Sequence, residues 1–405
     1  MSKVKNVTLV TDFGYEGRGT GGAIHAGKEF FHILNGLPVN LTVFALRYRG
    51  ETGQPPISSP KVHYIDLPFR GFLSLAETGI PWALKIRSRL KKMPPQDLYI
   101  SDQPLTYFPW FQKAPVACLF IGPEMGWHFG LGHLIRHPRS SLEVLLWQKP
   151  FLGRMQRNLL LRKIGIPLIN SRYTLRALAA EHNIDSKELE PYLIYQPADV
   201  AGYTKDEKAR VRWREKLGLR EEDVLITYIS NFAPKKRADR VPVIVRHYYD
   251  ALPKANAKFL FVGRGIAAAP LDELAGSEEF RDRCMRIGEV ESYEVRELYS
   301  ASDIAITTSE SETFGYTVVE GMAAGLPTVA YSEGSLPEIV TDDTGILLSK
   351  DDARGFAKAL MRLTTDIRLR QKMGLAARER AQKEFSREAF TARLLKILKQ
   401  EFNIP

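Results

Sequence analysis

The residues best suited to chemistry lie in the stretch 309–327, which is rich in glutamate, hydroxyl-bearing residues and glycine. A β-rich run at 304–307 precedes this stretch, and 318–324 has a helical pattern that ends at Gly325. The turn between them would present unpaired backbone amides at the N-terminus of the helix. Such amides bind anions, because the helix dipole places partial positive charge there.

Two glutamates flank the predicted amide turn. Glu312 lies in the turn, and Glu320 lies about one helical turn inside the helix. Both carboxylates could accept hydrogen bonds from hydroxyl groups of one ligand whose anionic part meets the amides. A sugar nucleotide needs this combination, with amides for the diphosphate and carboxylates for the ribose and hexose hydroxyls. The alternative is a solvated acidic loop, which suits Glu310 better than the other two glutamates.

A glycine-rich turn, 17–22, follows the first β-rich run of the chain. Its Gly21 and Gly22 would let backbone amides approach a phosphate closely. The following residues nearly fit a P-loop, but Glu29 stands where that motif needs a hydroxyl for Mg²⁺, so we exclude a P-loop. A phosphate-binding turn and a purely structural turn both stay open.

Short β-rich runs alternate with helical patterns along the chain, which is typical of parallel sheets covered by helices on both faces. The series restarts after a polar stretch, 196–205, which we interpret as a linker. The predicted strands are 7–10, 41–46, 62–65, 98–101, 116–121, 167–170 and 193–195 before it, and 224–230, 258–263, 285–287, 304–307, 328–331 and 345–348 after it. Ligands bind beyond the carboxyl ends of such strands, so two facing sheets would hold a ligand in a cleft between domains.

Glu312 and Glu320 enclose seven residues, and the surrounding stretch resembles the E-x7-E element of retaining glycosyltransferases with the GT-B fold. The chain most resembles glycosyltransferase family 4, of the glycosyl transferases group 1 type. The family's pattern is matched at 259–265, 287–290, 298–303, 331–340 and 344–348, and more loosely at 21–22 and 169–174. The resemblance covers nearly the whole chain and is strong after about residue 220.

This resemblance implies an α/β fold of two Rossmann-like, doubly wound domains that face each other across a cleft. An acceptor domain would span 1–198, and a nucleotide-sugar donor domain would span 199–385. The last helical pattern, 386–405, would either pack back on the first domain or remain a plain surface helix.

The resemblance also implies roles for individual residues. Glu312 would contact the donor hexose, and Glu320 would hold the ribose hydroxyls. The diphosphate would lie on backbone amides of the turn and of Gly22 in the first domain. The other positions that would bind the donor are Gly21, Gly263, Arg264, Val290, Phe314, Gly315, Tyr316 and Thr317.

The family usually supplies an Arg and a Lys after the first strand of the second domain, and this pair is only partly present. Lys236 stands at the Lys position, whereas Asn231 stands at the Arg position. Asn carries no charge and cannot replace a bidentate donor, so Lys235 or Arg237 would have to compensate. We expect Lys236 to offset the negative charge that develops on the leaving diphosphate.

The family often places a His near the transferred sugar, after the strand at 116–121. Glu124, His128 and His133 are the candidates here, with His128 as the catalytic choice and a surface or structural His as the alternative. The sequence contains no evident Asp-x-Asp metal motif, so we expect no metal and no other cofactor. The implied outcome is an α-linked product with retained anomeric configuration.

The chain has 405 residues and a formal net charge of +10, with 57 Lys and Arg against 47 Asp and Glu. Its 44% apolar content excludes a wholly disordered chain, and its two separated cysteines argue against a disulfide framework. No stretch has the length and apolarity of a membrane span or the pattern of a signal peptide, so we expect a cytoplasmic protein.

The basic excess is concentrated in the predicted first domain. One run holds Lys85, Arg87, Arg89, Lys91 and Lys92, and a second holds Arg136, Arg139, Lys149, Arg154, Arg157, Arg162 and Lys163 around Leu159, Leu160 and Leu161. Basic runs with apolar neighbours suit an anionic surface, such as the inner face of the cell membrane. The alternatives are a solvated face with core leucines, and a soluble acidic acceptor. Nucleic acid is disfavoured, because no recognition helix, RRM or zinc pattern accompanies the charge.

These patterns and the resemblance predict a metal-independent, retaining hexosyltransferase that uses a nucleoside-diphosphate sugar and a glycan or lipid-linked acceptor. Assembly of cell-envelope polysaccharide or lipopolysaccharide is the expected setting. The alternatives are a glycosyl phosphorylase or synthase that acts on a small sugar, and a non-catalytic module that binds sugar nucleotides or nucleic acid. Asn231, in place of the usual Arg, keeps the non-catalytic module open.

Overall fold

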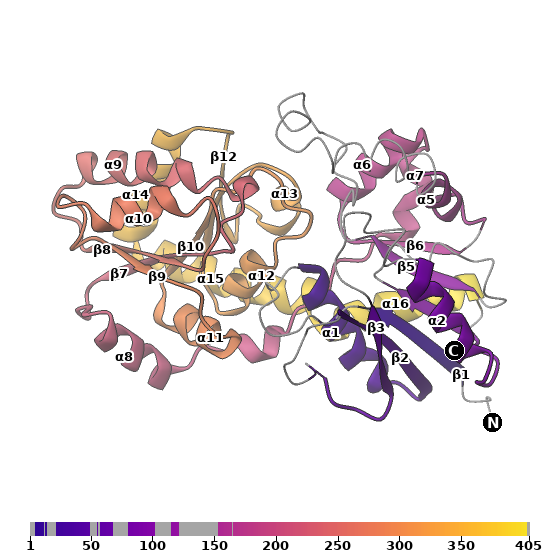
Figure 1. The fold of residues 1–405 in the computed structure, drawn as a ribbon. Helices are drawn as coiled ribbons and strands as arrows, with labels where there is room; N and C mark the ends of the chain where they lie inside the picture. Colours follow the sequence, from indigo (N-terminus) through magenta and orange to yellow (C-terminus); the bar gives the residue numbers. More distant parts are fainter. Residues whose placement is uncertain are drawn as a thin grey trace. The chain divides into compact units, whose positions relative to one another are not determined.

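The computed structural model describes residues 5–11, 13, 22–48, 55, 57–67, 80–101, 115–120, 153–163 and 165–402. The chain forms two compact units. Unit 1 consists of Met1–Tyr195 together with Thr391–Pro405, and unit 2 consists of Gln196–Phe390. Each unit contains one six-stranded sheet with helices packed around it (Figure 1).

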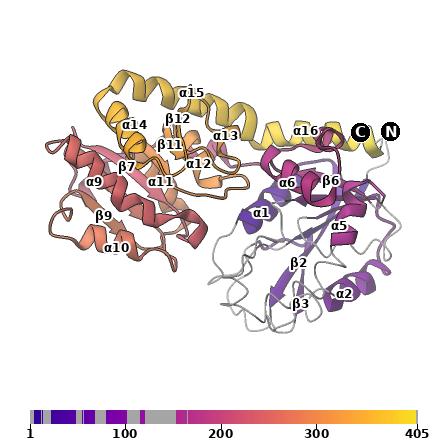
Figure 2. The same cartoon turned by 90° about the horizontal axis from the view of Figure 1, so that it is seen from above.

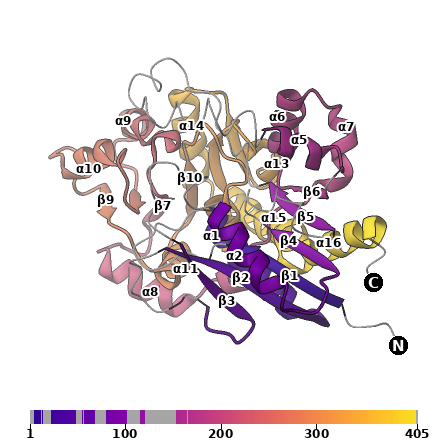
Figure 3. The same cartoon turned by 45° about the vertical axis from the view of Figure 1, so that its right-hand side comes forward.

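Unit 1 is built on a sheet whose neighbouring strands are all parallel, in the order β3-β2-β1-β4-β5-β6. Its elements are β1 (Lys5–Thr11), α1 (Gly22–Asn35), β2 (Val39–Tyr48), β3 (Val62–Leu67), α2 (Ile80–Leu90), β4 (Leu98–Ser101), β5 (Val116–Phe120), α5 (Gly153–Leu160), β6 (Ile166–Ile169), α6 (Arg172–His182), α7 (Ser186–Leu189) and the 3₁₀ helix η5 (Glu190–Tyr192). Figure 3 shows α1 and α2 over the strands of this sheet. The strand order reverses between β1 and β4, as in a doubly wound fold.

Unit 2 repeats the same topology, with strand order β12-β11-β10-β7-β8-β9 and only parallel neighbours. Its elements are η6 (Val200–Tyr203), α8 (Glu207–Lys216), β7 (Val224–Ile229), η7 (Pro234–Lys236), η8 (Ala238–Arg240), α9 (Val241–Ala251), β8 (Ala257–Val262), α10 (Ala269–Gly276), β9 (Cys284–Ile287), α11 (Ser292–Ala301), β10 (Ile304–Thr307), α12 (Tyr316–Ala323), β11 (Thr328–Tyr331), α13 (Leu336–Ile339), β12 (Gly345–Leu348), α14 (Ala353–Thr365) and α15 (Ile367–Phe385). Figure 1 shows α9, α10 and α14 on one side of the sheet and α8 and α11 on the other.

The strands of unit 2 form because they are continuous apolar runs that helices cover on both faces. All six residues of β7 are buried, as are all four of β10. On one face, the Tyr248 ring of α9 packs edge-on against Phe259 of β8, with ring centroids 5.7 Å apart. The strand order of unit 2 reverses between β7 and β10, so the loops that follow these two strands flank the crevice where such sheets bind ligands.

The last helix, α16 (Arg387–Phe402), begins in unit 2 and belongs to unit 1 from Thr391 onward. Figure 2 shows α16 in yellow, directly after α15 and beside elements of unit 1. In the part of the helix that belongs to unit 1, the side chains of Leu394, Ile397 and Leu398 are buried. Near its end, Glu401 Oε1 accepts a hydrogen bond of 2.6 Å from the Tyr192 hydroxyl of unit 1. The apolar stripe of this helix therefore packs into unit 1.

The predicted strands are confirmed to within two residues at each end, with one exception. Residues 193–195 were expected to form a strand, but only an isolated bridge joins Leu193 to Ile169. The 3₁₀ helix η5 ends directly before Leu193, and no second bridge follows in this segment. The prediction of a strand at 193–195 is therefore wrong.

The stretch 196–205 is not the plain polar linker that its composition indicates. It contains η6, and its residues Gln196, Ala198, Val200 and Tyr203 are buried. The Ala198 amide donates a 2.8 Å hydrogen bond to the Phe385 carbonyl, next to the bridge between Ala198 and Ser386. Alternate small and apolar residues among the polar ones pack this segment into unit 2.

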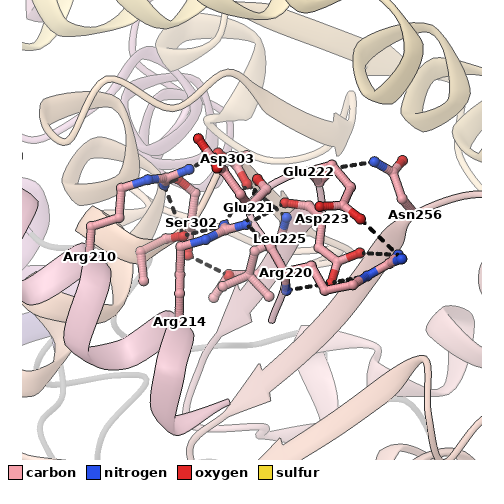
Figure 4. A network of polar contacts seen from close by, with 12 residues as sticks. Arg210, Arg214, Arg220, Glu221, Glu222, Asp223, Leu225, Asn256, Ser302 and Asp303 are labelled. Atoms are coloured by element: carbon pink, nitrogen blue, oxygen red, sulfur yellow. Dashed lines mark hydrogen bonds and ion pairs between the residues drawn. The ribbon is translucent and has the colours of Figure 1, made fainter. Parts of the chain in front are cut away.

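A buried ionic network holds the amino ends of β7 and β10 together (Figure 4). Arg210 and Arg214 reach from α8 to opposite oxygens of Asp303, at 2.9 and 3.3 Å. The same carboxylate accepts a 2.8 Å hydrogen bond from the Leu225 amide at the start of β7. Because this network lies at the amino ends of the strands, it stabilises the edge of the sheet opposite the ligand-binding crevice.

Among the helices of the described ranges, none combines the length and the apolar character that crossing a membrane requires.

Candidate active site

Lys236 and Glu312 form an ion pair at the reversal point of the second sheet. Lys236 follows β7 and Glu312 follows β10, and the Lys236 ammonium bonds directly to Glu312 Oε1. The side chains are only 12% and 9% exposed. Two of the residues predicted to be catalytic thus meet, although 76 positions separate them in the chain.

The backbone around Lys236 is fixed by hydroxyl groups from neighbouring strands. The Lys236 carbonyl accepts hydrogen bonds from the Tyr228 hydroxyl at 2.7 Å and from Thr308 Oγ1 at 3.0 Å. Burial raises the pKa of Tyr228 to about 12, so this hydroxyl stays protonated and donates at neutral pH. The Glu310 amide donates to the Lys235 carbonyl at 3.0 Å. The loops after β7 and β10 are therefore joined by a side chain-to-backbone and a backbone-to-backbone hydrogen bond, from Thr308 Oγ1 and from the Glu310 amide.

Glu312 is held by both its side chain and its backbone. Ser309 Oγ donates to Glu312 Oε1 at 2.8 Å, and the Ser335 amide donates to the Glu312 carbonyl at 2.8 Å. Gly334 has φ +60° and lies so close that a Cβ on it would be 2.4 Å from the Glu312 carbonyl oxygen. Only glycine fits this position, because the left-handed backbone and the close approach both exclude a side chain.

The helix α12 begins at Tyr316, directly after this loop and two residues before the predicted helical pattern 318–324. Gly315 precedes it with φ +85°, and Phe314 is buried against the rings of Tyr316 and Phe385, with centroids 5.0 and 5.7 Å away. Phe314 is thus anchored, and Gly315 turns the chain directly before the first amides of α12, which include that of Thr317. The first amides of a helix have no intrahelical partner, so they can bind an anion.

Glu320 lies one turn inside α12 and is 8% exposed. It bonds to the hydroxyl of Tyr203, a residue of η6. Burial, and after it the charge of Glu320, raises the pKa of Tyr203, so the hydroxyl donates to the carboxylate. Burial and the same carboxylate also raise the pKa of Tyr299, whose hydroxyl donates to the Thr317 carbonyl at 2.8 Å. Two tyrosines thus surround the second glutamate of the motif.

The loops after β7 and β8 approach each other backbone to backbone. A Cβ on Gly263, at φ +121°, would lie 1.8 Å from the Ser230 carbonyl oxygen. Asn231 is exposed, and its side-chain oxygen accepts from the Ala233 amide at 3.4 Å. Arg264 is 65% exposed and pairs with Glu289 at 2.5 Å, next to the half-buried Val290. These predicted donor-binding residues share the carboxyl edge of the sheet with Lys236.

The two cations named as substitutes for the missing Arg have different environments. The Arg237 guanidinium pairs with Asp239 at 2.9 Å and with Glu310 at 3.0 Å, and these contacts raise its pKa. The side chain of Lys235 is exposed and carries no ion pair with any described residue. Among the described residues, Lys235 thus has fewer ionic partners than Arg237.

Several predicted residues lie outside the described residues. Gly21, Glu124, His128 and His133 are among them, whereas Gly22 is the first residue of α1. Within the described ranges, no group of three or more His, Cys, Asp or Glu side chains is arranged to hold a metal ion.

Two contributors to the site were not predicted from the sequence. Tyr203 lay within the presumed linker, where the apolar residues at 198, 200 and 203 are the signal of a packed segment. Arg240 lies in η8 and donates to the Thr308 carbonyl at 2.9 Å, and no motif of the sequence marks it.

Comparisons with known proteins identify similar sequences and folds. The family described as glycosyl transferases group 1 matches residues 209–380. N-acetyl-alpha-D-glucosaminyl L-malate synthase of Bacillus anthracis is 28% identical over 208 residues, which are 51% of this chain and 53% of that protein. A GDP-mannose-dependent monoacylated alpha-(1-6)-phosphatidylinositol monomannoside mannosyltransferase of Corynebacterium glutamicum is 28% identical over 258 residues, 60% of this chain and 65% of that protein. The chain thus spans about half to two thirds of the length of these two relatives.

Solved structures show the fold over nearly the whole chain. Sucrose-phosphate synthase from Thermosynechococcus elongatus has a TM-score of 0.74 at 17% identity, with 98% of this chain and 99% of that one covered. Anabaena HepE in complex with UDP and glucose has a TM-score of 0.69 at 16% identity, with the same coverage. Residues 209–380 of this chain are therefore a domain of the glycosyl transferases group 1 family, carried on a GT-B fold.

Proposed function

We propose that this protein is a glycosyltransferase that moves a hexose from a nucleoside-diphosphate sugar to a glycan or lipid-linked acceptor, with retention of anomeric configuration. The observation that carries the proposal is the buried pair of Lys236 and Glu312, next to the amide end of α12. A cation and amides suit a diphosphate, and a carboxylate suits sugar hydroxyls.

Each group has a distinct role in the proposed reaction. Glu320 accepts hydrogen bonds from the ribose hydroxyls, and Glu312 contacts the hexose. The bond between the anomeric carbon and the diphosphate oxygen breaks, which leaves oxocarbenium-like charge on the sugar. Lys236 and the first amides of α12 offset the charge that appears on the departing diphosphate. A new bond then joins the anomeric carbon to an acceptor hydroxyl, whose proton leaves with the diphosphate.

We further propose that the reaction needs no metal or other cofactor. Lys236 and the helix N-terminus together supply the positive charge that a divalent cation gives to other transferases. Lys235, with its exposed and uncommitted ammonium, is the proposed substitute for the Arg that Asn231 replaces. The nucleotide base would lie by the loops after β8 and β9, near Gly263, Arg264 and Val290.

A lipid-linked acceptor at the inner face of the cell membrane is the proposed setting. Lys85, Arg89 and the two lysines after α2 are exposed, which leaves their charge available to an anionic surface. Leu159 and Leu160, by contrast, are buried core residues, so they do not contribute an apolar membrane contact. The name of the relative that acts on a phosphatidylinositol monomannoside fits a lipid-linked acceptor.

A thermal-shift panel with UDP, GDP, ADP, dTDP and CMP tests donor binding. One nucleotide should raise the melting temperature clearly, because a ligand that binds only the native state stabilises it by mass action. Vesicle flotation with anionic and neutral lipids at low salt tests the membrane setting. If no nucleotide stabilises the protein and duplex DNA binds it instead, the transferase proposal is wrong.

A further inference from the structure

Arg240 is a buried cation that belongs to the segment carrying Lys236. It is the last residue of η8, its side chain is 5% exposed, and its guanidinium lies 4.8 Å from the centre of the Tyr331 ring. An arginine buried this deeply needs partners for its charge and its donors. Its polar partners lie in the loops after β10, β11 and β12, three successive strands on one side of β7.

The contacts of Arg240 follow the strand order. Nη1 donates to the Thr308 carbonyl at 2.9 Å, directly after β10, and to Glu333 Oε2 at 2.7 Å, two residues after β11. Nε lies 2.7 Å from Asp351 Oδ1, after β12. One side chain from the loop after β7 therefore ties together the exits of three successive strands.

Two of these loops, those after β10 and β11, also contain residues that contact Glu312. The loop that begins at Thr308 continues through Ser309, whose hydroxyl bonds Glu312. The loop that contains Glu333 continues to Gly334 and Ser335, which contact the Glu312 backbone. Arg240 joins the starts of both loops, and Glu312 lies where they meet.

We propose that Arg240 is a positioning residue that locks these two loops together and so holds Glu312 in the place where it meets Lys236. The role of Glu312 in transfer rests on the proposed function, whereas the locking of the loops does not. Lys350, 3.4 Å from Glu333, is the only other described cation on that carboxylate, and it is 60% exposed. Without Arg240, the exposed Lys350 would be the remaining described cation beside Glu333. The loop that contains Glu333 would then lose its buried ion pair.

Arg214 provides a matched control for the burial of an arginine. It is also buried, at 9% side-chain exposure, and it also bridges a carboxylate, Asp303, and backbone carbonyls. Its network lies at the amino ends of the strands, away from Glu312. Arg240→Met and Arg214→Met should both lower the melting temperature, but only Arg240→Met should disturb the proposed site.

The first readout is hydrogen exchange of the full chain without ligand. Arg240→Met should speed exchange of amides in 308–314 and 333–336, including the Ser335 amide, while Arg214→Met should leave these segments as in the wild type. Equal exchange in both variants would overturn the proposal. Arg240→Lys keeps the charge but cannot contact all the partners that the guanidinium contacts at once. This variant replaces Arg240→Met if the Met variant does not fold. It should increase the exchange rate of these amides by a smaller factor.

The second readout is steady-state turnover of the nucleotide sugar that the wild type uses, below the melting temperature of every variant. Arg240→Met should lower kcat by about 100-fold, as expected for a displaced reacting group, with KM for the donor changed by less than about threefold. Arg214→Met should keep kcat within about twofold. A kcat for Arg240→Met that matches Arg214→Met would overturn the proposal. A wild type that turns over no nucleotide sugar would instead overturn the proposed function, and the exchange data would still decide the role of Arg240.

Discussion

The Lys236 ammonium and the Glu312 carboxylate are joined across the reversal point of the second sheet. Both side chains are about nine-tenths buried, so their charges act in a medium that screens them far less than water. Each side chain holds the other in place. A ligand that enters here meets a positive and a negative group side by side, which suits a sugar diphosphate.

Replacement of Lys236 by methionine should lower kcat by about 10²- to 10³-fold, because the leaving diphosphate loses a preorganised cation. Glu312 then also loses its ionic partner, so the melting temperature should fall modestly. Steady-state kinetics of nucleotide-sugar turnover measure the first effect. Lys254→Met, at an exposed lysine, is the matched control and should change neither quantity. A Lys236→Met enzyme with wild-type kcat would exclude this role.

Glu320→Ala should raise the Kd of the nucleoside diphosphate by about 10- to 100-fold, since two hydrogen bonds to a charged acceptor are lost. Tyr203→Phe keeps the carboxylate and removes only the hydroxyl that bonds it, so the loss should be under about fivefold. Isothermal titration calorimetry measures both. Glu310→Ala, which removes a carboxylate that pairs with Arg237, should bind normally. Equal affinity of Glu320→Ala and the wild type would refute ribose recognition by Glu320.

Much of this arrangement could be predicted from the sequence. The strands are apolar runs bounded by polar turns, so their positions agree to within two residues. The helix after Glu312 was expected from its pattern and its terminal glycine. In both cases, residues near in sequence decide the structure.

The unpredicted parts depend on residues that are distant in sequence. The meeting of Lys236 with Glu312 needs the strand order, which periodicity does not reveal. Tyr203 and Arg240 are marked by no local pattern, because their partners come from other elements. The expected strand at 193–195 failed although its residues suit a strand, because only Leu193 pairs with a neighbouring strand, in a single bridge to Ile169.

Asp303→Asn should cost about 3 kcal/mol of unfolding free energy, because it leaves Arg210 and Arg214 without their carboxylate. The Leu225 amide also loses a charged acceptor at the start of β7. Urea unfolding followed by circular dichroism measures the change. Asp342→Asn, at an exposed aspartate, is the control. Similar losses in both variants would show that the network in Figure 4 contributes little.

Stability should fall as the pH drops through about 6.5, partly because of His182 in α6. Burial, and after it the charge of Arg157, lowers the pKa of His182 in the folded protein. The unfolded chain therefore binds the proton more readily, and the free energy of unfolding decreases toward acid pH. His182→Gln should reduce the difference in melting temperature between pH 7.5 and 5.5. His63→Gln, at an exposed histidine, should not. An unchanged difference in His182→Gln would contradict this assignment.

The most direct test of the central claim compares the wild type with Glu312→Gln in two assays on the same nucleotide sugar. Turnover is followed by release of the nucleoside diphosphate, and binding of that diphosphate is followed by calorimetry. The wild type should turn the donor over, whereas Glu312→Gln should bind the diphosphate with near-normal affinity and release it at least about 100-fold more slowly. Turnover by Glu312→Gln at the wild-type rate would contradict the claim that Glu312 and Lys236 form the reaction centre.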